Sequence, residues 1–446
     1  MNEKLILSKE DLNKAPLLNL EGLHRDLGKT MVVASHPDDE SLGCGGLLAL
    51  LSKQKSEVWV IFMTNGEASH PNSKSYPPQR LGELRQQEAQ KACEILGVST
   101  KHVIFLDVGD GKLPHFSKAT QKTYIEKLSQ IFSNLDIDTV FTPWRRDHHS
   151  DHLATTNWVR EAIKKQNIVL VEYPVWLWKK GSPADWPTET EILPFRLEIG
   201  SVIEQKKQAI AAHRSQTSNL IPDDPDGFLF SADLLKPFTG DYEYFFFNRQ
   251  TKADVPPSYF SELYESDADP WNFENSAYEH EKYRASLACF QEKNFTRMLE
   301  IGCANGVFTK MLAPQCDNLL ALDINEIALR KAEERCAELP QCRFLQLDVT
   351  QMFPQGFYDG IVLSEVGYYL IEESLLTLFE DINRSLMPGG SFLMVHWTAY
   401  VRNYPLTGKE VHRLFKKNFS KYFRLIHHQN ASLYEIQCWE KIVEEK

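Results

Sequence analysis

Short apolar runs alternate with amphipathic segments along the first 170 residues, and this alternation restricts the fold more than any other feature. The apolar runs have the length of buried strands, and they are 31–35, 58–63, 103–106, 138–142 and 168–173. The segments between them have helical spacing, and they are 43–55, 80–96, 119–134 and 152–166. Because strands that alternate with helices form βαβ units, the pattern predicts an α/β fold: a Rossmann-like three-layer αβα domain with a mostly parallel sheet.

A second alternation begins near Arg297, which indicates a second domain. Residues 175–250 contain more Trp, Pro and Asp, and we expect them to complete the first domain. The polar segment 251–257 (TKADVPP) ends in two prolines and predicts a linker. At 446 residues the chain is also long for a single core. We therefore predict two α/β domains, at residues 1–250 and 258–446.

The composition restricts the partners and the compartment. The chain has 61 acidic and 49 basic residues, a net charge of -12, which argues against nucleic acid as a partner. No apolar stretch approaches the ~18 residues of a transmembrane segment, and the first residues lack the apolar core of a signal peptide. The eight cysteines form no C-x-x-C pair, so we expect reduced thiols in a cytoplasmic enzyme. The oligomeric state is not indicated.

Two motifs place imidazoles and carboxylates at the ends of two predicted strands. Ser-His-Pro-Asp-Asp-Glu occupies residues 35–40, and His-Ser-Asp-His occupies residues 149–152. The carboxyl ends of parallel strands meet at one edge of a sheet, where sites of open α/β folds form. One His and one Asp from the first motif, with one His from the second, make a three-ligand metal site. Its fourth position stays open for water, as in a catalytic zinc centre.

Further motifs extend this pattern in a fixed order. In sequence they are His36-Pro-Asp-Asp39, Gly43-Cys-Gly-Gly46, Thr64-Asn-Gly-Glu67, Arg85-x-x-Glu88 with Leu96-Gly-Val98, Asp110-Gly-x-Leu113, His149-x-Asp-His152 and KKQAIAAHRSQ from Lys206 to Gln216. This order resembles the PIG-L/LmbE-like superfamily over about residues 28–248. Members of that superfamily are zinc-dependent enzymes that remove N-acetyl groups from amino sugars.

The resemblance implies that His36, Asp39 and His152 bind the metal ion. Two imidazoles and one carboxylate also suit Fe(II), as in non-haem oxygenases. Those enzymes usually have β-sandwich scaffolds, so the predicted alternation of strand and helix favours Zn2+, with Fe2+ in the cell as an alternative. The other alternative is that these side chains make only ordinary hydrogen bonds at strand ends.

The resemblance also implies the catalytic groups. Asp38 would take the proton of the attacking water and pass it to the leaving amine, and its alternative role is to cap a helix. His149, oriented by Asp151, would act as an imidazolium that stabilises the oxyanion or protonates the amine. Some relatives have a Tyr two residues before this His, and this chain has Asp147 there. For His213 we expect a structural role.

Arg85 and Asp110 match positions that bind substrate in the same superfamily. There they hydrogen-bond sugar hydroxyls, so the expected substrate is a small molecule, an oligosaccharide or a glycolipid. The alternative is a surface charge on a helix for Arg85 and a turn residue for Asp110.

A second constellation follows residue 297. The strand-like run from Met298 leads into a glycine turn that contains Gly302 and Gly306, and Asp323 and Asp348 end the next two runs. In Rossmann-type nucleotide sites, glycines allow close approach of the backbone to the ligand and an acid binds the ribose hydroxyls. This pattern by itself equally fits an NAD site. Two further features favour S-adenosylmethionine and resemble class I methyltransferases. They are Glu300 before the first glycine and the later Met387-Pro-Gly-Gly390. The resemblance implies that Glu300, Gly302 and Gly306 bind the methionine moiety, Asp323 the ribose and Asp348 the adenine amine.

More specific motifs lie around this constellation. They are Asp269-Pro-Trp271, Tyr278-Glu-x-x-Lys-Tyr283, Ser364-Glu-Val-Gly-Tyr-Tyr-Leu370, His396-Trp397 and Pro405-Leu-x-Gly408 with Val411-His412. They resemble the nodulation-type (NodS-like) N-methyltransferases over about residues 260–440, a family that methylates the free amine of a de-N-acetylated chitin oligosaccharide. The resemblance places Glu365, Tyr368 and His396 near the methyl-acceptor site, where a carboxylate or imidazole would help an amine lose its proton.

The fusion itself predicts a bifunctional enzyme. Deacetylation creates an amine, N-methylation consumes one, and joining the two sites raises the effective concentration of the intermediate. One alternative is two activities on unrelated substrates. The other is that one half is a non-catalytic ligand-binding or scaffold module.

Overall fold

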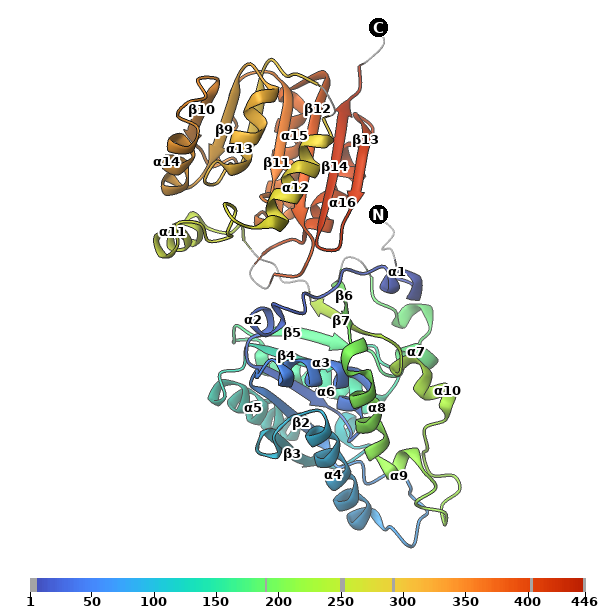
Figure 1. Ribbon diagram of the computed structural model, residues 1–446. Coiled ribbons are helices and arrows are strands. Elements are labelled where there is room, and N and C mark those ends of the chain that lie inside the picture. Colours follow the sequence, from blue (N-terminus) through green and yellow to red (C-terminus); the bar gives the residue numbers. More distant parts are fainter. Residues whose placement is uncertain (1–5, 189–190, 249–252, 291–292, 402–403, 444–446) are drawn as a thin grey trace. The chain divides into compact units, whose positions relative to one another are not determined.

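In the computed structural model the chain divides into two compact units, residues 1–249 and 250–446 (Figure 1). The structure describes residues 6–188, 191–248, 253–290, 293–401 and 404–443. The predicted linker begins at Thr251, and residues 251–252 lie outside the described residues.

The first unit is built on a seven-stranded sheet with the order β3-β2-β1-β4-β5-β7-β6. The strands are β1 (Thr30–Ala34), β2 (Val58–Thr64), β3 (Val103–Val108), β4 (Thr139–Pro143), β5 (Val169–Tyr173), β6 (Ile192–Glu198) and β7 (Tyr242–Asn248). The first five strands are parallel, and β7 runs antiparallel to both β5 and β6. All five runs predicted as strands are strands in the structure.

The helices of the first unit cover both faces of this sheet (Figure 1). They are α1 (Lys9–Asn13), α2 (Leu23–Leu27), α3 (Asp39–Lys53), α4 (Pro78–Ile95), α5 (Lys118–Asn134), α6 (Ser150–Ile163), α7 (Leu177–Lys180), α8 (Ile203–Ala212), α9 (Arg214–Thr217) and α10 (Ala232–Leu235). Short 3-10 turns are η1 (Thr100–His102), η2 (Leu113–His115), η3 (Pro183–Asp185), η4 (Gly200–Val202) and η5 (Lys236–Phe238). Helices α3 and α4 pack with α8, and α5 packs with α6.

Helix α3 begins at Asp39, four residues before the predicted start, so the first motif enters a helix directly. This helix is buried along most of its length because it has no side chain at Gly43. A Cβ there would lie 2.2 Å from Cδ2 of Tyr173. The glycine therefore lets α3 approach β5, and this approach positions residues 35–40 at the start of the helix.

The second unit repeats the strand order of the first, β10-β9-β8-β11-β12-β14-β13. Its strands are β8 (Met298–Ile301), β9 (Leu319–Asp323), β10 (Cys342–Gln346), β11 (Tyr358–Ser364), β12 (Leu386–Trp397), β13 (Phe423–Asn430) and β14 (Tyr434–Lys441). Its helices are α11 (Pro257–Ser266), α12 (Ala277–Ala288), α13 (Val307–Leu312), α14 (Glu326–Arg335), α15 (Glu372–Ser385) and α16 (Gly408–Phe419), with 3-10 turns η6 (Ala313–Gln315) and η7 (Gly367–Tyr369). Again the first five strands are parallel and the strand added beyond them, β14, is antiparallel.

The predicted fold class is confirmed in both units. Each sheet reverses its strand order at one point, between β1 and β4 and between β8 and β11, and such points form crevices for ligands. No helix among the described residues is long and apolar enough to cross a membrane. All eight cysteines lie within the described residues and none forms a disulfide.

Candidate active sites

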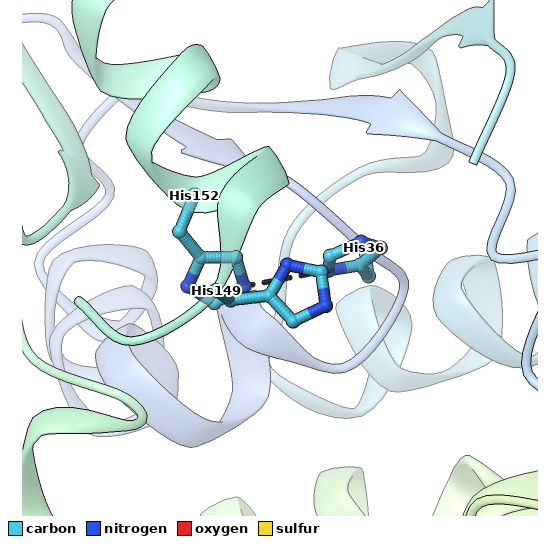
Figure 2. Close-up of side chains that lie close together, drawn as sticks. All are labelled: His36, His149 and His152. Carbon is cyan, nitrogen blue, oxygen red and sulfur yellow. Dashed lines mark hydrogen bonds between the residues drawn. The ribbon is translucent and has the colours of Figure 1, made fainter. Parts of the chain in front are cut away.

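Three side chains of the first unit meet where β1 and β4 end. His36 follows β1, Asp39 begins α3, and His152 lies in the first turn of α6; Figure 2 shows both imidazoles together with His149. His36 Nδ1 lies 3.3 Å from His152 Nε2. Asp39 Oδ2 lies 3.2 Å from His152 Nε2 and 3.5 Å from His36 Nδ1. We call these three atoms the donor triangle.

The donor triangle has the dimensions of a zinc site. A tetrahedral zinc ion with ligands at about 2.0–2.1 Å holds them about 3.3 Å apart, and the three sides of the triangle agree. The electrostatic environment also fits a cation. Burial alone would lower the pKa of His152, but Asp39 and Asp147 outweigh this effect and raise the pKa to about 9. The pocket therefore stabilises positive charge at the triangle.

Carboxylates hold the outer nitrogen of each imidazole. Asp147 Oδ2 lies 2.7 Å from Nδ1 of His152. Asp110 Oδ1 and Asp151 Oδ2 lie 3.2 and 3.3 Å from Nε2 of His36. A carboxylate on one ring nitrogen makes that nitrogen the N–H, which leaves the other with a lone pair for a metal. With a metal ion bound, both rings would thus present a lone pair to the triangle.

Asp147 is a residue whose role the sequence did not predict. It replaces the tyrosine of some relatives, is fully buried, and accepts backbone N–H groups from Val175, Trp176 and Leu177 as well as contacting His152. Through Asp147, the backbone after β5 is therefore connected to His152 on α6. Nothing in the local sequence signals this, because the partners lie 28 to 30 residues away.

The carboxylates of Asp151 and Asp110 both contact His36, whereas Asp151 was predicted to orient His149. The carboxylate of Asp151 contacts His36, and only the backbone N–H of Asp151 reaches His149, donating to Nδ1 at 3.2 Å. Asp110 also contacts His36, and its second oxygen accepts the N–H of Ala68 at 2.9 Å. Both carboxylates therefore orient a ring of the donor triangle. The predicted binding of sugar hydroxyls by Asp110 stays a prediction.

Asp38 adopts a strained backbone conformation beside the triangle. Its φ is 132° and its ψ is -30°, a region that non-glycine residues occupy at a cost and mostly at functional sites. Nη2 of Arg85 donates to Asp38 Oδ2 at 2.8 Å and to the carbonyl of Pro37 at 2.6 Å. Burial raises the pKa of Asp38 to about 7, and the Arg85 charge opposes that rise. Arg85, predicted to bind substrate, thus contacts the predicted general base.

The surroundings of His149 favour its neutral imidazole over the expected imidazolium, and the imidazolium stays a prediction. Burial and the neighbouring His36 and His152 lower the pKa of His149 to about 3. Its Nδ1 accepts the N–H of Asp151, so Nε2 carries the ring proton. The T-shaped ring pair with His36, 4.7 Å between centroids, keeps this donor at the triangle. His149 can therefore donate a hydrogen bond but does not hold a spare proton.

In the second unit the glycine turn follows β8. Gly302 has φ 82° and Gly306 has φ 78°, both in the left-handed region. A Cβ on Gly306 would lie 2.7 Å from the Cα of Ala332, so α13 begins against α14 only because this residue is glycine. Ala304, between these two glycines, also adopts a positive φ of 47°.

The predicted cofactor acids surround this turn. Asp323 Oδ2 accepts the N–H of Ala304 at 2.9 Å, and Asp348 Oδ1 accepts the hydroxyl of Thr350 at 2.7 Å. Glu300 is 1% exposed, burial raises its pKa to about 7 against the opposing effect of the nearby Thr309 hydroxyl, and its Oε2 makes no hydrogen bond of good geometry within the described chain. A buried acceptor without a well-formed hydrogen bond is costly, so the turn fits a ligand that brings a donor.

Glu365, Tyr368 and Trp397 meet at the ends of β11 and β12. Glu365 has φ 58°; Lys282 Nζ contacts its Oε1 at 2.5 Å, and its Oε2 accepts the Tyr368 hydroxyl at 2.6 Å and the Trp397 N–H at 2.9 Å. Lys282 is 1% exposed and also pairs with Glu279 at 2.8 Å. Both oxygens of Glu365 are therefore occupied within the protein.

His396 lies beside this cluster with both ring nitrogens in contacts. Nε2 accepts the N–H of Gly367 at 3.1 Å, and Nδ1 lies 3.2 Å from Nε2 of His412. Burial and the Lys282 charge lower the pKa of His396 to about 3. The three predicted acceptor residues are thus brought together, but Glu365 and His396 are already engaged. The sequence did not single out Lys282 or His412 as members of this cluster.

Comparisons with known proteins find a different family match in each of the two units. Residues 31–163 match the family model described as GlcNAc-PI de-N-acetylase (PIG-L). A deacetylase of 1D-myo-inositol 2-acetamido-2-deoxy-alpha-D-glucopyranoside from Corynebacterium diphtheriae is 30% identical over 165 residues, 33% of this chain and 56% of that protein. The 2'-N-acetylparomamine deacetylase of Streptomyces fradiae is 24% identical over 208 residues, 43% of this chain and 75% of that protein.

Residues 261–399 match the model of nodulation protein S (NodS). Nodulation protein S of Sinorhizobium fredii is 33% identical over 124 residues, 27% of this chain and 57% of that protein. The chain spans about half the length of the nodulation proteins it matches. Both predicted resemblances are confirmed: a PIG-L deacetylase domain precedes a NodS-like methyltransferase domain.

Proposed function

We propose that this protein is a bifunctional enzyme. Its first unit hydrolyses the N-acetyl group of an amino sugar or glycoconjugate, and its second unit N-methylates the resulting amine with S-adenosylmethionine. The observation that carries the proposal is the donor triangle in the PIG-L domain of a chain that also contains a NodS-like domain. The first reaction makes the amine that the second consumes.

His36, Asp39 and His152 are the residues that would hold the metal ion, for which we propose zinc. When bound, such an ion polarises the acetamide carbonyl and makes water more acidic. The outer carboxylates on His36 and His152 support the proposal, because they fix the nitrogen that faces the ion in each ring.

In the first reaction Asp38 transfers the proton and His149 donates a hydrogen bond to the substrate. Asp38 takes a proton from the attacking water and returns it to the leaving nitrogen as the C–N bond breaks. A pKa of about 7 suits a group that acts as base and then as acid near neutral pH. His149 donates its Nε2–H to the acetamide oxygen, where negative charge develops. Acetate and a primary amine are the products.

The second unit would bind S-adenosylmethionine at its glycine turn. We propose that Gly302 and Gly306 admit the methionine moiety, that Oε2 of Glu300 accepts its ammonium group, that Asp323 binds the ribose and that Asp348 binds the adenine amine. The buried Oε2 of Glu300 supports the second of these assignments. At the acceptor end, the hydroxyl oxygen of Tyr368 can accept an amine N–H, because its proton is donated to Glu365.

Products of the purified full chain test the proposal directly. The protein is incubated with zinc, isotopically methyl-labelled S-adenosylmethionine and a panel of N-acetylhexosamine oligomers and other N-acetylated glycosides. Both deacetylase relatives are named for acetamido glycoside substrates, which supports this panel. We expect mass spectrometry to show loss of an acetyl group and then gain of labelled methyl on the same molecule. Methylation of the acetylated compound without deacetylation, or no acetate from any member, would contradict the proposal.

A further inference from the structure

A second carboxylate is buried behind the donor triangle and has no assigned role. Glu40 follows Asp39 and is fully buried. Its Oε2 accepts the backbone N–H of Asp38 at 2.9 Å. Its Oε1 accepts the hydroxyl of Ser41 at 2.5 Å and lies 2.9 Å from Nε2 of His213. Glu40 therefore connects the backbone of Asp38 to a distant part of the chain.

His213 supplies that distant contact from the junction of α8 and α9. It is 1% exposed and lies 173 residues from Glu40 in sequence. Burial alone would lower the pKa of His213, but the charge of Glu40 outweighs this effect and raises it. The imidazole therefore donates Nε2–H to Oε1, which leaves Oε2 of Glu40 for Asp38.

The backbone of Asp38 needs such support. A non-glycine residue at φ 132° is strained and persists only where its surroundings fix it. Glu40 holds the N–H of Asp38, and Arg85 holds its carboxylate. The carbonyl of Asp38 accepts the N–H groups of Ser41 and Leu42 at 3.1 and 2.9 Å. Each of these contacts fixes a different group of the same residue.

We propose that Glu40, held by His213, is the positioning residue that keeps Asp38 in its strained conformation beside the donor triangle. This inference rests on the proposed deacetylase function, in which Asp38 moves the proton. Glu40 acts only through Asp38, because its two oxygens are taken up by Asp38, Ser41 and His213.

Glu40→Ala tests the proposal by separating turnover from binding. We expect kcat for deacetylation to fall about 10²-fold, the cost of a catalytic group that is displaced by about 1 Å. KM and the zinc affinity of the apoprotein should stay within about 2-fold, because the donor triangle is intact. Glu40→Gln keeps an oxygen for the Asp38 N–H and should recover most of the kcat. Loss of zinc binding in Glu40→Gln, or equal kcat in Glu40→Ala and wild type, would overturn the proposal.

A double substitution shows whether Glu40 acts through Asp38. In an Asp38→Asn background, Glu40→Ala should cause no further loss of residual turnover, because the group that it positions is already gone. An additional loss of the size seen in the wild-type background would mean that Glu40 acts independently, and would overturn the proposal.

Glu88→Ala is the matched control. Glu88 is also a buried glutamate, and it accepts the N–H and hydroxyl of Ser215 at 2.8 and 2.6 Å, in the segment that contains His213. It should retain a kcat within about 3-fold of wild type. A fall in kcat as large as that of Glu40→Ala would show that any buried glutamate here has this effect, and would overturn the proposal.

Crystal structures of the apoprotein variants give a readout that is independent of activity. We expect Asp38 to leave the positive φ region in Glu40→Ala and to keep it in Glu88→Ala. Retention of φ near 132° in Glu40→Ala would overturn the positioning role. If wild type instead releases no acetate from any substrate, the proposed function fails, while this structural comparison still decides the positioning role.

Discussion

The two units have the same strand order, but the polar side chains at the corresponding sheet edges differ in how far they are bonded within the protein. At the edge of the first sheet, His36 and His152 turn free nitrogens toward each other while carboxylates hold their outer sides. At the corresponding edge of the second sheet, both oxygens of Glu365 and both nitrogens of His396 are engaged within the protein. The strand order therefore determines where a site forms in each unit. The donor and acceptor atoms that are not already bonded within the protein determine what that site can bind.

The cofactor end of the second unit differs from the donor triangle in a further way. It depends on backbone conformation at Gly302 and Gly306 and on the buried carboxylate of Glu300. A metal site depends on side-chain donors, whereas a nucleotide-type site depends on backbone that can come close to its ligand. Substitutions should therefore affect the two units independently and by different amounts.

The largest effect should follow His152→Ala. Removal of one of three ligands leaves too few donors to hold the ion, so we expect bound zinc and deacetylation to be lost together. Metal content by elemental analysis and acetate release measure this, and methylation of a supplied free-amine sugar should be unchanged. Full zinc occupancy in the variant would show that His152 is not a ligand. The site of the first unit would then not depend on the side-chain donors of the triangle.

Asp323→Ala is the reciprocal test. Asp323 supports the glycine turn through the N–H of Ala304 and is proposed to hold the ribose, so binding of S-adenosylmethionine should fall below detection by calorimetry. Deacetylation should continue, and the free-amine sugar should accumulate in the mass spectrum. If the variant retains methylation, the cofactor does not bind as proposed.

Asp38→Asn should lower kcat for deacetylation about 10²–10⁴-fold while zinc stays bound. The amide keeps the size of the side chain but cannot take the proton of water. The variant should also fail to methylate the acetylated sugar, since an amide nitrogen is a poor nucleophile, yet it should methylate the free amine. If it still methylates the acetylated compound, the two units act on different molecules.

A smaller effect should follow Asp147→Asn. The substitution weakens the partner of His152 Nδ1 but leaves all three ligands, so we expect zinc affinity to fall about 10–100-fold. Competition with a fluorescent chelator measures this. An affinity equal to that of wild type would mean that the backbone alone orients the ring.

The smallest effect should follow His396→Gln. With its pKa lowered to about 3, His396 is neutral from pH 5 upward and contributes no step to a pH–rate profile there. The Gln amide can still accept the N–H of Gly367. We expect the pH profile of methylation to superimpose on that of wild type, with kcat changed less than about 3-fold. If an inflection near pH 6–7 in the wild-type profile is lost in the variant, His396 carries a proton in that range. That result would contradict a neutral His396.

Much of the molecule could be predicted from local pattern. The five apolar runs of the first unit became β1 to β5, because short apolar runs that alternate with amphipathic helical segments form the strands of a parallel sheet covered by helices. The sequence also predicted that His36 and His152 lie at one edge of the sheet, since His36 follows the end of β1 and His152 lies in the first turn of α6, the helix after β4. The antiparallel strands β6 and β7 were not predicted as a pair, because their partners lie far apart in sequence.

The sequence by itself determined the two α/β units, their families and which residue types stand at each sheet edge, because strand period and motif spacing are properties of neighbouring residues. Only the tertiary structure decided which carboxylate serves which ring. Asp151 faces His36 rather than His149, and Arg85 and Glu40 hold Asp38. The surroundings there also shift the pKa values, down for His149 and up to about 7 for Asp38. The physical reason is that burial and contacts between distant segments, such as His36 with Asp151 and Asp38 with Arg85, set these charges, and no local pattern encodes them.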